Sequence, residues 1–448
     1  MVNQLDDNRE FKDSALGMIP KDWDVVKLSS VFQIKTGATP LRAKHQLYFV
    51  DGIIPWVKTM DLNEGGITYT DEYITERALK ECSVQILPPK TLLIAMYGGW
   101  EQIGRTGILK IQATTNQAIS SLIPISSCVE SEFIIFALQF GRNRWKQVAV
   151  STRKDPNITS NDVANFVIQL PPIPEQQQIA KILDTVDKAI AQTETLIAKY
   201  KRVKTGLMQD LLTRGIDEHG QLRDPSTHKF KRSPLGMIPD EWEIKLLSTV
   251  ADVSSGVTLG RKVTGLGTIE LPYLRVANVQ DGYLDLSEVK TIHIYKEELS
   301  RYLLQPNDVL MNEGGDYDKL GRGTVWRGQI PLCLHQNHVF RVRPNIDYLF
   351  SDFLAFISAS SYGKNFFILN SKQSTNLASI NSTQLKSFPI PCPPVLEQKK
   401  IIVIYEKIEI LIKIEQKKHD NLQKIKIGLM QDLLTGKTSV KPLLTNQP

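Results

Sequence analysis

The chain has 448 residues, of which 42% are hydrophobic and 23% charged, a composition typical of globular proteins with more than one domain. No apolar run approaches the ~18 residues that a membrane-crossing helix needs, and the opening residues lack the apolar core of a secretory signal. The excess of six positive charges permits an anionic partner without requiring one. Four scattered cysteines without an export signal predict reduced thiols in the cytoplasm.

A polar tail over residues 1–13 precedes a mixed globular part that we predict over residues 14–170. Short β-rich runs such as VQILPPKTLLIAMY alternate with Gly and Pro, whereas SEFIIFALQFGRNRW is typical of a helix. Strands and helices therefore share this part of the chain, and we expect an α+β fold.

A long helix is predicted over residues 171–213. The sequence PPIPEQ is a start signal, because Pro suits the first turn and Glu175 lies at the positive end of the helix dipole. Apolar side chains then recur in alternating steps of three and four, as in the heptad seam of a coiled coil. The predicted seam consists of Ile179, Ile182, Val186, Ala189, Thr193, Leu196, Tyr200, Val203 and Leu207.

The rest of the chain repeats this plan. A polar linker over residues 214–232 leads into a second globular part, predicted over residues 233–392. FKDSALGMIPKDWDVVKLSSV from Phe11 matches FKRSPLGMIPDEWEIKLLSTV from Phe230 at 12 of 21 positions. PPIPEQQQI at the first helix start is matched by PPVLEQKKI at the second. The chain is therefore two copies of one module.

The second long helix is predicted over residues 393–435, followed by a tail over residues 436–448. The octapeptide GLMQDLLT closes both helices, starting at Gly206 and again at Gly428. Because a long helix with an apolar seam needs a partner, we expect the two helices to form an antiparallel coiled coil with pseudo-two-fold symmetry. The second seam consists of Ile401, Ile404, Ile408, Leu411, Leu422, Ile425 and Leu429.

The order of these motifs resembles the specificity subunit of type I restriction-modification systems over nearly the full length. The resemblance implies that residues 14–170 and 233–392 are target-recognition domains, each reading one half of a bipartite DNA site. It also implies that the helices fix the spacer between the half-sites and dock two DNA adenine methyltransferase subunits. Glu415 and Lys418 depart from the family pattern by interrupting the second seam.

The same resemblance assigns catalysis to partner subunits. S-adenosylmethionine, ATP and Mg²⁺ would belong to the methyltransferase subunits and to motor-endonuclease (restriction) subunits. This chain would be a non-catalytic, cytoplasmic component that binds double-stranded DNA and no membrane. We therefore expect it to hold no cofactor of its own.

Motifs that would contradict a non-catalytic role are weak. GKTS from Gly436 imitates the end of a phosphate-binding loop, but it follows a helix and lacks the earlier Gly, which favours a helix end. PDEWEIK from Pro239 resembles a nuclease metal site, yet its repeat PKDWDVVK does not keep the pattern. Cys333, His335 and His338 could ligate a metal, but the first module has nothing similar at the aligned position. We expect neither a catalytic nor a metal site.

The candidate DNA contacts are chosen by the hydrogen-bonding groups and charges of their side chains. Arg suits guanine, Asn and Gln suit adenine, and Lys and Arg bind phosphate. In the first domain the candidates are Arg105, Asn116, Gln117, Arg142, Arg144, Lys146, Arg153 and Lys154. In the second they are Arg275, Asn278, Asn312, Arg322, Gln336, Asn337, Lys364 and Lys372. Each could equally be a solvated surface residue with no ligand.

Two other functions remain open from the sequence. A single-chain restriction nuclease or methyltransferase would be active alone with Mg²⁺ or S-adenosylmethionine. A duplicated coiled-coil scaffold would bind no DNA. Retention of a random DNA library by the chain with its methyltransferase would exclude the scaffold.

Overall fold

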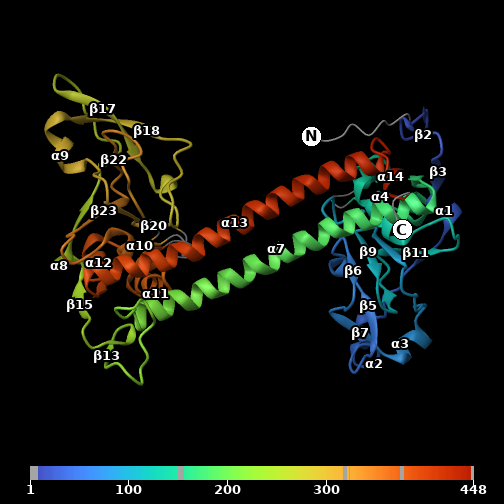
Figure 1. The fold of residues 1–448 in the computed structure, drawn as a ribbon, viewed down its shortest axis with the longest axis horizontal. Helices are drawn as coiled ribbons and strands as arrows, with labels where there is room; N and C mark the ends of the chain where they lie inside the picture. Colours follow the sequence, from blue (N-terminus) through green and yellow to red (C-terminus); the bar gives the residue numbers. More distant parts are fainter. Residues whose placement is uncertain (1–8, 150–155, 316–319, 322, 374–377, 445–448) are drawn as a thin grey trace. The chain divides into compact units, whose positions relative to one another are not determined.

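A computed structural model gives the fold (Figure 1). It describes residues 9–149, 156–315, 320–321, 323–373 and 378–444. The chain forms two compact units that do not follow chain order. Unit 1 combines residues 1–194 with residues 417–448, whereas unit 2 is the continuous stretch 195–416.

Unit 1 is built from two antiparallel-rich sheets and two short ribbons. Its strands are β1 (Phe11–Lys12), β2 (Ile19–Pro20), β3 (Asp24–Lys27), β4 (Phe32–Thr36), β5 (Ile54–Val57), β6 (Gly66–Ile67), β7 (Glu72–Ile74), β8 (Leu92–Ala95), β9 (Thr106–Leu109), β10 (Thr114–Thr115), β11 (Ile119–Pro124) and β12 (Val167–Leu170). The larger sheet has the order β4-β11-β8-β9-β6 and the smaller one β10-β5-β7. The ribbons pair β1 with β2 and β3 with β12.

Short helices cover these sheets. They are α1 (Leu28–Val31), α2 (His45–Tyr48), α3 (Glu76–Glu81), α4 (Ser131–Phe140), α5 (Trp145–Val148), α6 (Ser160–Asn165), α14 (Lys441–Leu444) and the 3-10 turns η1 (Arg42–Lys44), η2 (Thr59–Asp61) and η3 (Arg142–Arg144). The segment SEFIIFALQF forms α4, as its composition predicts. Phe133 and Ile134 of α4 are fully buried in the main core of unit 1.

Unit 2 has its own set of strands and helices. Its strands are β13 (Phe230–Ser233), β14 (Gly236–Pro239), β15 (Glu243–Leu246), β16 (Ala251–Ser255), β17 (Thr268–Leu274), β18 (Lys290–Tyr295), β19 (Val309–Asn312), β20 (Gly314–Gly315), β21 (Gly323–Val325), β22 (Leu334–His335), β23 (Val339–Pro344), β24 (Lys372–Gln373), β25 (Ala378–Ser379) and β26 (Pro389–Cys392). Its short helices are α8 (Leu247–Val250), α9 (Leu299–Tyr302), α10 (Ser351–Ala359), α11 (Ser361–Asn370), α12 (Ser382–Lys386), η4 (Val276–Asn278) and η5 (Lys296–Glu298).

The repeat in sequence is also a repeat in topology. In unit 2, β23 lies between β16 and β19, just as β11 lies between β4 and β8 in unit 1. The central strand β17 has an antiparallel neighbour, β18, and a parallel one, β22. Strand β5 has the same two kinds of neighbour in β7 and β10. Two copies of one mixed α/β domain are therefore present, as predicted.

The two predicted long helices are present as α7 (Ile173–Thr213) and α13 (Val395–Leu434), with 41 and 40 residues. In unit 1, Lys426 pairs with Asp187 at 2.6 Å and His419 with Glu194 at 3.2 Å. Residue numbers rise along α7 as they fall along α13, so the two segments lie antiparallel. No helix within the described ranges combines the length and apolar character needed to cross a bilayer.

Unit 2 shows the same antiparallel register. Lys204 of α7 pairs with Glu409 of α13, and the Lys204 ammonium also lies over the ring of Tyr405. The carboxylate of Glu409 is partly buried, which raises its pKa, but hydrogen bonds from Lys204 and Tyr405 outweigh burial and leave the pKa below its ordinary value.

The predicted seam is correct in part. Most of its members are buried or half-buried, but Val203, Leu411 and Ile425 are 47%, 42% and 51% exposed, so their assignment to a buried seam is wrong. On α7 the buried face is instead completed by Leu183 and Ile197. An α-helix drifts relative to a strict heptad, and a count in steps of three and four gradually leaves the contact face. Ile179, Ile182, Val186, Leu196, Tyr200, Leu207, Ile401, Ile404, Ile408, Leu422 and Leu429 keep some burial.

The repeated octapeptide is an anchor in a globular core. Leu211 and Leu212, at the end of α7, belong to the main core of unit 2. Leu433 and Leu434, at the end of α13, belong to the main core of unit 1. Each globular part is thus completed by the last turns of a helix from the other copy.

Glycines end both long helices in the left-handed region, where a side chain would be strained. Gly215 has φ +60° and Gly436 has φ +69°. A Cβ on Gly215 would lie 2.3 Å from the ring of Trp242, and one on Gly436 would lie 2.4 Å from Pro20. The GKTS motif is therefore a helix end packed on the domain.

A buried glutamate secures the start of each long helix. In unit 2, Glu397 accepts hydrogen bonds from Arg223 at 2.5 and 3.0 Å and from the indole of Trp242 at 3.3 Å. In unit 1, Glu175 accepts from Arg9 at 2.7 Å and from the indole of Trp23 at 3.4 Å. We call these the Glu397 cluster and the Glu175 cluster.

Candidate nucleic-acid interface

Two neighbouring amide side chains occupy the same place in each unit. Asn116 and Gln117 directly follow β10, and Gln336 and Asn337 directly follow β22. In both units the first amide residue donates its backbone N–H, at 2.9 Å, to a carbonyl at the end of the central strand of the smaller sheet. The next residues then enter the larger sheet as β11 or β23. The predicted amide pairs therefore lie where the two sheets of each unit join.

In each unit a glycine packs closely against the backbone of the segment that carries the amide pair. Gly37 and Gly256 directly follow β4 and β16, and they are 219 residues apart, as are Phe11 and Phe230 at the start of the repeat. A Cβ on Gly37 would lie 2.2 Å from the carbonyl oxygen of Asn116. A Cβ on Gly256 would lie 1.9 Å from the carbonyl oxygen of His335. Only glycine permits this close approach of two backbones.

The four amides differ in what they can offer to a ligand. Asn116 is half-buried, and its Oδ1 accepts a hydrogen bond from the backbone of Ala118 at 3.1 Å. Gln117 is exposed. Gln336 and Asn337 are half-buried, and Asn337 contacts the ring of His338 at 3.3 Å. Gln117 is therefore the amide best placed to reach the edge of a base.

A second loop in unit 1 contacts the residue that follows the amide pair. It joins β8 to β9, and Met96 donates its backbone N–H to Ala118 at 2.8 Å. The loop carries Arg105, which is half-buried and bonds Gln102 at 3.1 Å. It also carries Tyr97 and Trp100, which are 43% and 46% exposed.

Sequence reasoning missed these two aromatic residues. The signal was the segment MYGGW, in which paired glycines set two large rings in a loop. Exposed rings beside amide and guanidinium groups are typical of surfaces that contact nucleic acid bases.

Two predicted contacts in unit 2 are wrong. Asn278 and Asn312 are only 3% and 1% exposed, so their amides cannot reach DNA. Asn278 donates to Asp285 at 2.8 Å and to Glu288 at 2.9 Å, and Asn312 donates to Val279 at 2.9 Å. Both side chains donate to carbonyl groups of the loop that follows β17, which is the usual role of a buried amide.

Arg142 also supports a loop, and because its side chain stays 31% exposed, its role as a DNA contact stays a prediction. Its guanidinium donates to the carbonyl groups of Glu101 at 2.6 Å and Ile103 at 3.1 Å, and it pairs with Glu64 at 3.0 Å. The two carbonyl contacts hold the β8–β9 loop in place, and the ion pair joins Arg142 to the segment before β6.

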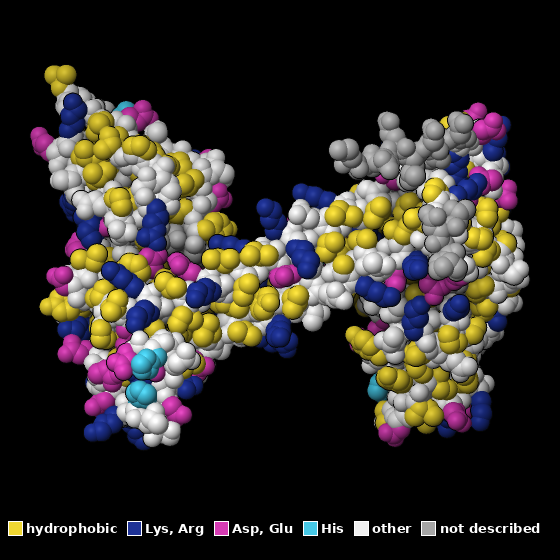
Figure 2. Space-filling view, viewed as in Figure 1, with side chains coloured by type: hydrophobic (Ala, Val, Ile, Leu, Met, Phe, Trp, Pro, Cys, Tyr) yellow, Lys and Arg dark blue, Asp and Glu magenta, His cyan; other side chains and the backbone are white. Residues whose placement is uncertain are grey.

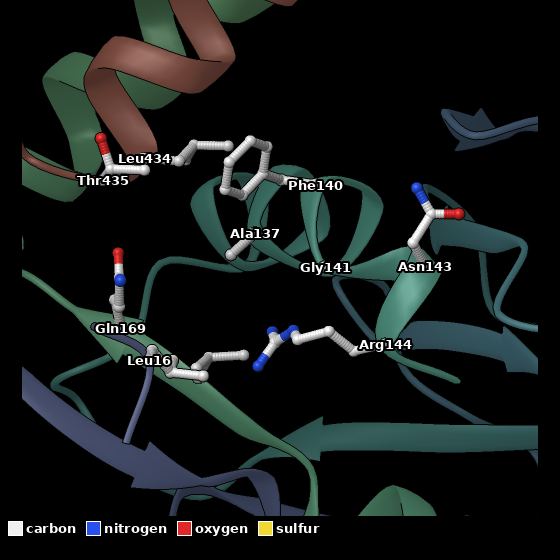
Figure 3. A pocket seen from close by; sticks show the side chains of 10 residues that line it. Leu16, Ala137, Phe140, Gly141, Asn143, Arg144, Gln169, Leu434 and Thr435 are labelled. Atoms are coloured by element: carbon white, nitrogen blue, oxygen red, sulfur yellow. The ribbon is translucent and has the colours of Figure 1, made fainter. Parts of the chain in front are cut away.

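Arg144 is likewise committed within unit 1, contrary to its prediction as a DNA contact. It donates to Val167 at 2.9 Å and lies over the ring of Phe166 at 4.2 Å. Burial lowers its pKa from the ordinary value. Figure 3 shows Arg144 pointing toward Leu16 in a pocket of about 270 Å³ that Leu434 also lines, while Asn143 points away from it.

The remaining predicted contacts are variously placed. Lys146 and Lys372 are exposed. Arg275 bonds the carbonyl of Glu288 at 3.2 Å, and Lys364 pairs with Asp281 at 2.8 Å. Arg153, Lys154 and Arg322 lie outside the described residues.

Cys333 and His335, two of the three residues considered as metal ligands, lie in the protein core of unit 2. Cys333 and His335 are 1% and 0% exposed. Burial raises the pKa of Cys333 to about 12 and lowers the pKa of His335 to about 4. His338 is exposed and pairs with Glu313 at 2.6 Å. Within the described residues, no three His, Cys, Asp or Glu side chains are grouped to hold a metal ion.

Comparison with known proteins identifies the family of the duplicated domain. The family described as the type I restriction modification DNA specificity domain matches residues 20–202 and again residues 239–424. The chain belongs to this family. Each specificity domain takes in one globular part and much of the long helix that follows it, so the two matches reproduce the internal repeat.

Relatives of this specificity protein align with most of its length. The specificity subunit of the type I restriction enzyme MjaVIII from Methanocaldococcus jannaschii is 25% identical and covers 99% of each chain. The EcoKI specificity subunit from Escherichia coli is 23% identical, over 86% of this chain and 82% of its own. The crystal structure of an S subunit from M. genitalium has a TM-score of 0.56 at 15% identity and covers 96% of this chain and 97% of its own. It shares the fold.

The glycines under the amide pairs give a first test. Replacing Gly256 by valine should displace the Gln336–Asn337 segment, because even the Cβ has no room there. We expect unit 2 to lose about 2 kcal/mol or more of stability, measured by urea unfolding. The matched control is Gly206→Ala on α7, where nothing lies within 4 Å of the new Cβ. It should gain up to about 1 kcal/mol. Equal losses in both variants would contradict a steric role for Gly256.

Proposed function

We propose that the chain is the DNA-recognition subunit of a type I restriction-modification complex, and that each specificity domain reads one half of a bipartite site. The observation that carries this is the duplication itself. Both domains present a pair of adjacent amides at the same junction of two sheets, supported by an equivalent glycine. Amides at equal positions in two copies of a domain suit two separate base-reading sites.

The helices α7 and α13 are proposed to form an antiparallel coiled coil with pseudo-two-fold symmetry, which sets the spacer between the half-sites. Support comes from the ion pairs between the helices. They have the same antiparallel register in unit 1, at Asp187 and Lys426, as in unit 2, at Lys204 and Glu409. A coiled coil of fixed length would hold the spacing constant.

An apolar stripe on α13 supports the docking of a methyltransferase subunit. Within unit 2 it consists of Leu396, Val403, Ile410, Leu411 and Ile414, which are between 42% and 67% exposed. Leu396, Val403, Ile410 and Ile414 follow one another at spacings of seven and four residues, and Leu411 adjoins Ile410 at the border of the same face. Figure 2 shows hydrophobic side chains gathered along α13. Such an exposed stripe is typical of a surface that another protein covers.

The aligned positions on α7 are unlike this stripe. They are occupied by Pro174, Lys181, Lys188, Ala189 and Gln192. The two proposed methyltransferase subunits would therefore meet different helix faces.

Catalysis is proposed to belong to those methyltransferase subunits and to motor-endonuclease subunits, which would bind S-adenosylmethionine, ATP and Mg²⁺. This chain would contribute the choice of site. A single-chain nuclease or methyltransferase would be recognised by turnover in the purified chain with Mg²⁺ or S-adenosylmethionine.

Exchange of one domain tests the proposal. Replacing residues 14–170 by the corresponding domain of another family member should change one half-site completely and leave the other half-site and the spacer unchanged. The reason is that the exposed amide Gln117 and its loop belong to that segment, whereas unit 2 keeps its own amides. Sequencing the methylated adenines in host DNA gives the result.

The reciprocal exchange of residues 233–392 is the control, and it should change only the other half-site. A methylation map altered in both halves by either exchange would contradict separate reading by the two domains. Absence of any sequence preference in the unmodified complex would contradict DNA recognition itself.

A further inference from the structure

A pocket of about 400 Å³ lies in unit 2 beside the apolar stripe of α13. Its lining comes from α13 and from the turn of the linker that follows α7. The residues that line it are Ile216, Glu218, His219, Gly220, Lys399, Lys400, Val403, Ile404 and Lys407. Of its aliphatic side chains, Ile216 is buried, whereas Val403 is 52% exposed and also belongs to the stripe. The pocket and the stripe therefore form one surface.

Three lysines accompany the stripe along this part of α13. An α-helix turns by about 100° per residue, so Lys399, Lys400 and Lys407 all point within about 60° of the direction of Val403. Lys399 and Lys407 are exposed, and Lys400 is half-buried. Three cations therefore flank the apolar side chains on the same face of the helix.

Among the described residues, these lysines contact neutral groups. The ammonium of Lys399 lies over the ring of Phe350 at 5.7 Å. The ammonium of Lys400 donates to the backbone carbonyl of Glu218 at 3.3 Å. Within the described ranges, no carboxylate lies at ion-pair distance from either of these lysines or from Lys407.

The acidic side chains nearby do not neutralise the lysines. The carboxylate of Glu218 is 85% exposed and lies 3.4 Å from the imidazole of His219. Glu409 pairs with Lys204 of α7. Glu406 is exposed at the border of the same face and supplies one negative charge against three positive ones. The surface therefore stays positive.

The first module lacks this positive surface. Its helix start, PPIPEQQQI, aligns with PPVLEQKKI, and the residues at the positions of the three lysines are Gln177, Gln178 and Thr185. Because α7 forms the same kind of long helix without these charges, the module does not need them to fold. The lysines are a feature of the second copy alone.

A protein that covers the stripe would also remove the three ammonium groups from water. Burying a cation without a counter-charge is costly, whereas a paired and hydrogen-bonded cation is tolerated. We propose that the methyltransferase segment that covers this stripe is acidic, with an apolar side chain in the pocket and carboxylates at Lys399, Lys400 and Lys407. The inference rests on the proposed function and deepens it by giving the chemistry of one docking contact. The stripe favours a protein over DNA, because a phosphate backbone has no apolar face to cover it.

Removal of the three charges tests the proposal. The measurement is the dissociation constant of each methyltransferase binding step, obtained by mass photometry of the purified complex on dilution. Replacing Lys399, Lys400 and Lys407 together by Gln should weaken one step by at least about tenfold at ~0.1 M salt, as expected for three surface ion pairs. The other step should not change, because the aligned face of α7 lacks these lysines.

The dependence on salt gives a second measurement. The Debye length falls from about 10 Å at 0.1 M to about 3 Å at 1 M, so the step that the Gln variant weakens should itself weaken with salt in the unmodified complex. In the Gln variant this step should depend less steeply on salt. Replacing the same three lysines by Arg keeps the charges, and both dissociation constants should stay within about threefold of the unmodified values.

The matched control removes the same charge from exposed positions elsewhere in unit 2. It replaces Lys262, Lys296 and Lys372 by Gln, none of which lines the pocket. Both binding steps should keep the dissociation constants of the unmodified complex.

The outcomes separate the two proposals. An unmodified chain that binds no methyltransferase would overturn the proposed function. Two bound methyltransferases with the same dissociation constants in the Gln variant as in the unmodified complex would overturn only the acidic contact. Equal losses in the Gln and Arg variants, or in the Gln variant and the control, would also overturn it. So would a Gln variant that keeps both steps but binds a random duplex with a smaller dependence on salt, because its lysines would then contact phosphate.

Discussion

Replacing Glu397 by alanine should destabilise unit 2 by about 3–5 kcal/mol. The carboxylate accepts two hydrogen bonds from Arg223, one from the indole of Trp242 and one from the backbone of Ile216 at 3.0 Å. The side chains of Glu397 and Arg223 are both 9% exposed. The substitution leaves the Arg223 guanidinium buried without its principal counter-charge. Hydrogen exchange of peptides from residues 230–392 should accelerate by about 100- to 5,000-fold.

The Glu175 cluster supplies the matched control for this prediction. Glu175→Ala should accelerate exchange in peptides from residues 11–149 and leave those from unit 2 unchanged, because Arg9 and Trp23 belong to unit 1. Acceleration in both units by either substitution would show that the clusters do not stabilise their units separately.

Replacing Ile410 and Ile414 together by aspartate should remove one of the two proposed methyltransferase subunits from the complex. Both side chains are 55% exposed in the apolar stripe of α13. Charges in the centre of a buried interface should weaken that contact by at least about 100-fold. The positions aligned with them on α7 are Lys188 and Gln192, so we do not expect the second proposed methyltransferase to dock on such a stripe. Native mass spectrometry should show a ratio of one to one in place of two to one.

Ile427→Asp is the control for the stripe. This residue is 69% exposed on the same helix but lies well away from the face that the stripe forms. The ratio of two to one should persist. Loss of both methyltransferases from the double variant would contradict docking on unlike helix faces.

The long helices and the duplicated domain plan could be predicted from the sequence, because both leave a pattern that survives without coordinates. PPIPEQ and PPVLEQ predict where the two long helices start. The repeat from Phe11 and Phe230 predicts two domains with the same fold. The role of the octapeptide could not be predicted. Leu211 and Leu433 continue an apolar helix pattern, and whether such a side chain packs on a second helix or in a domain core depends on contacts distant in sequence.

The same limit applies to the charged and amide residues. Glu175 suits a helix N-terminus, but the pattern does not show that Arg9 binds it, since the residue aligned with Arg9 is His228 rather than Arg223.

Among the amides, Asn278 and Gln117 are equally plausible ligands for a base from composition alone. Only the fold shows that the first is buried against carbonyl groups and that the second is exposed. Residue type therefore predicts which side chains could bind a base, and burial excludes some of them.

The placement of the octapeptides has a consequence for synthesis on the ribosome. Unit 2 is continuous and has all its residues once Gln416 has emerged, whereas unit 1 still lacks residues 417–448. The core that Leu433 and Leu434 complete stays open until the last part of the chain is made. Domains usually fold in the order of their synthesis, but here the domain that is begun first is finished last. A ribosome that stops before Leu433 therefore releases a chain whose second domain is complete and whose first is not.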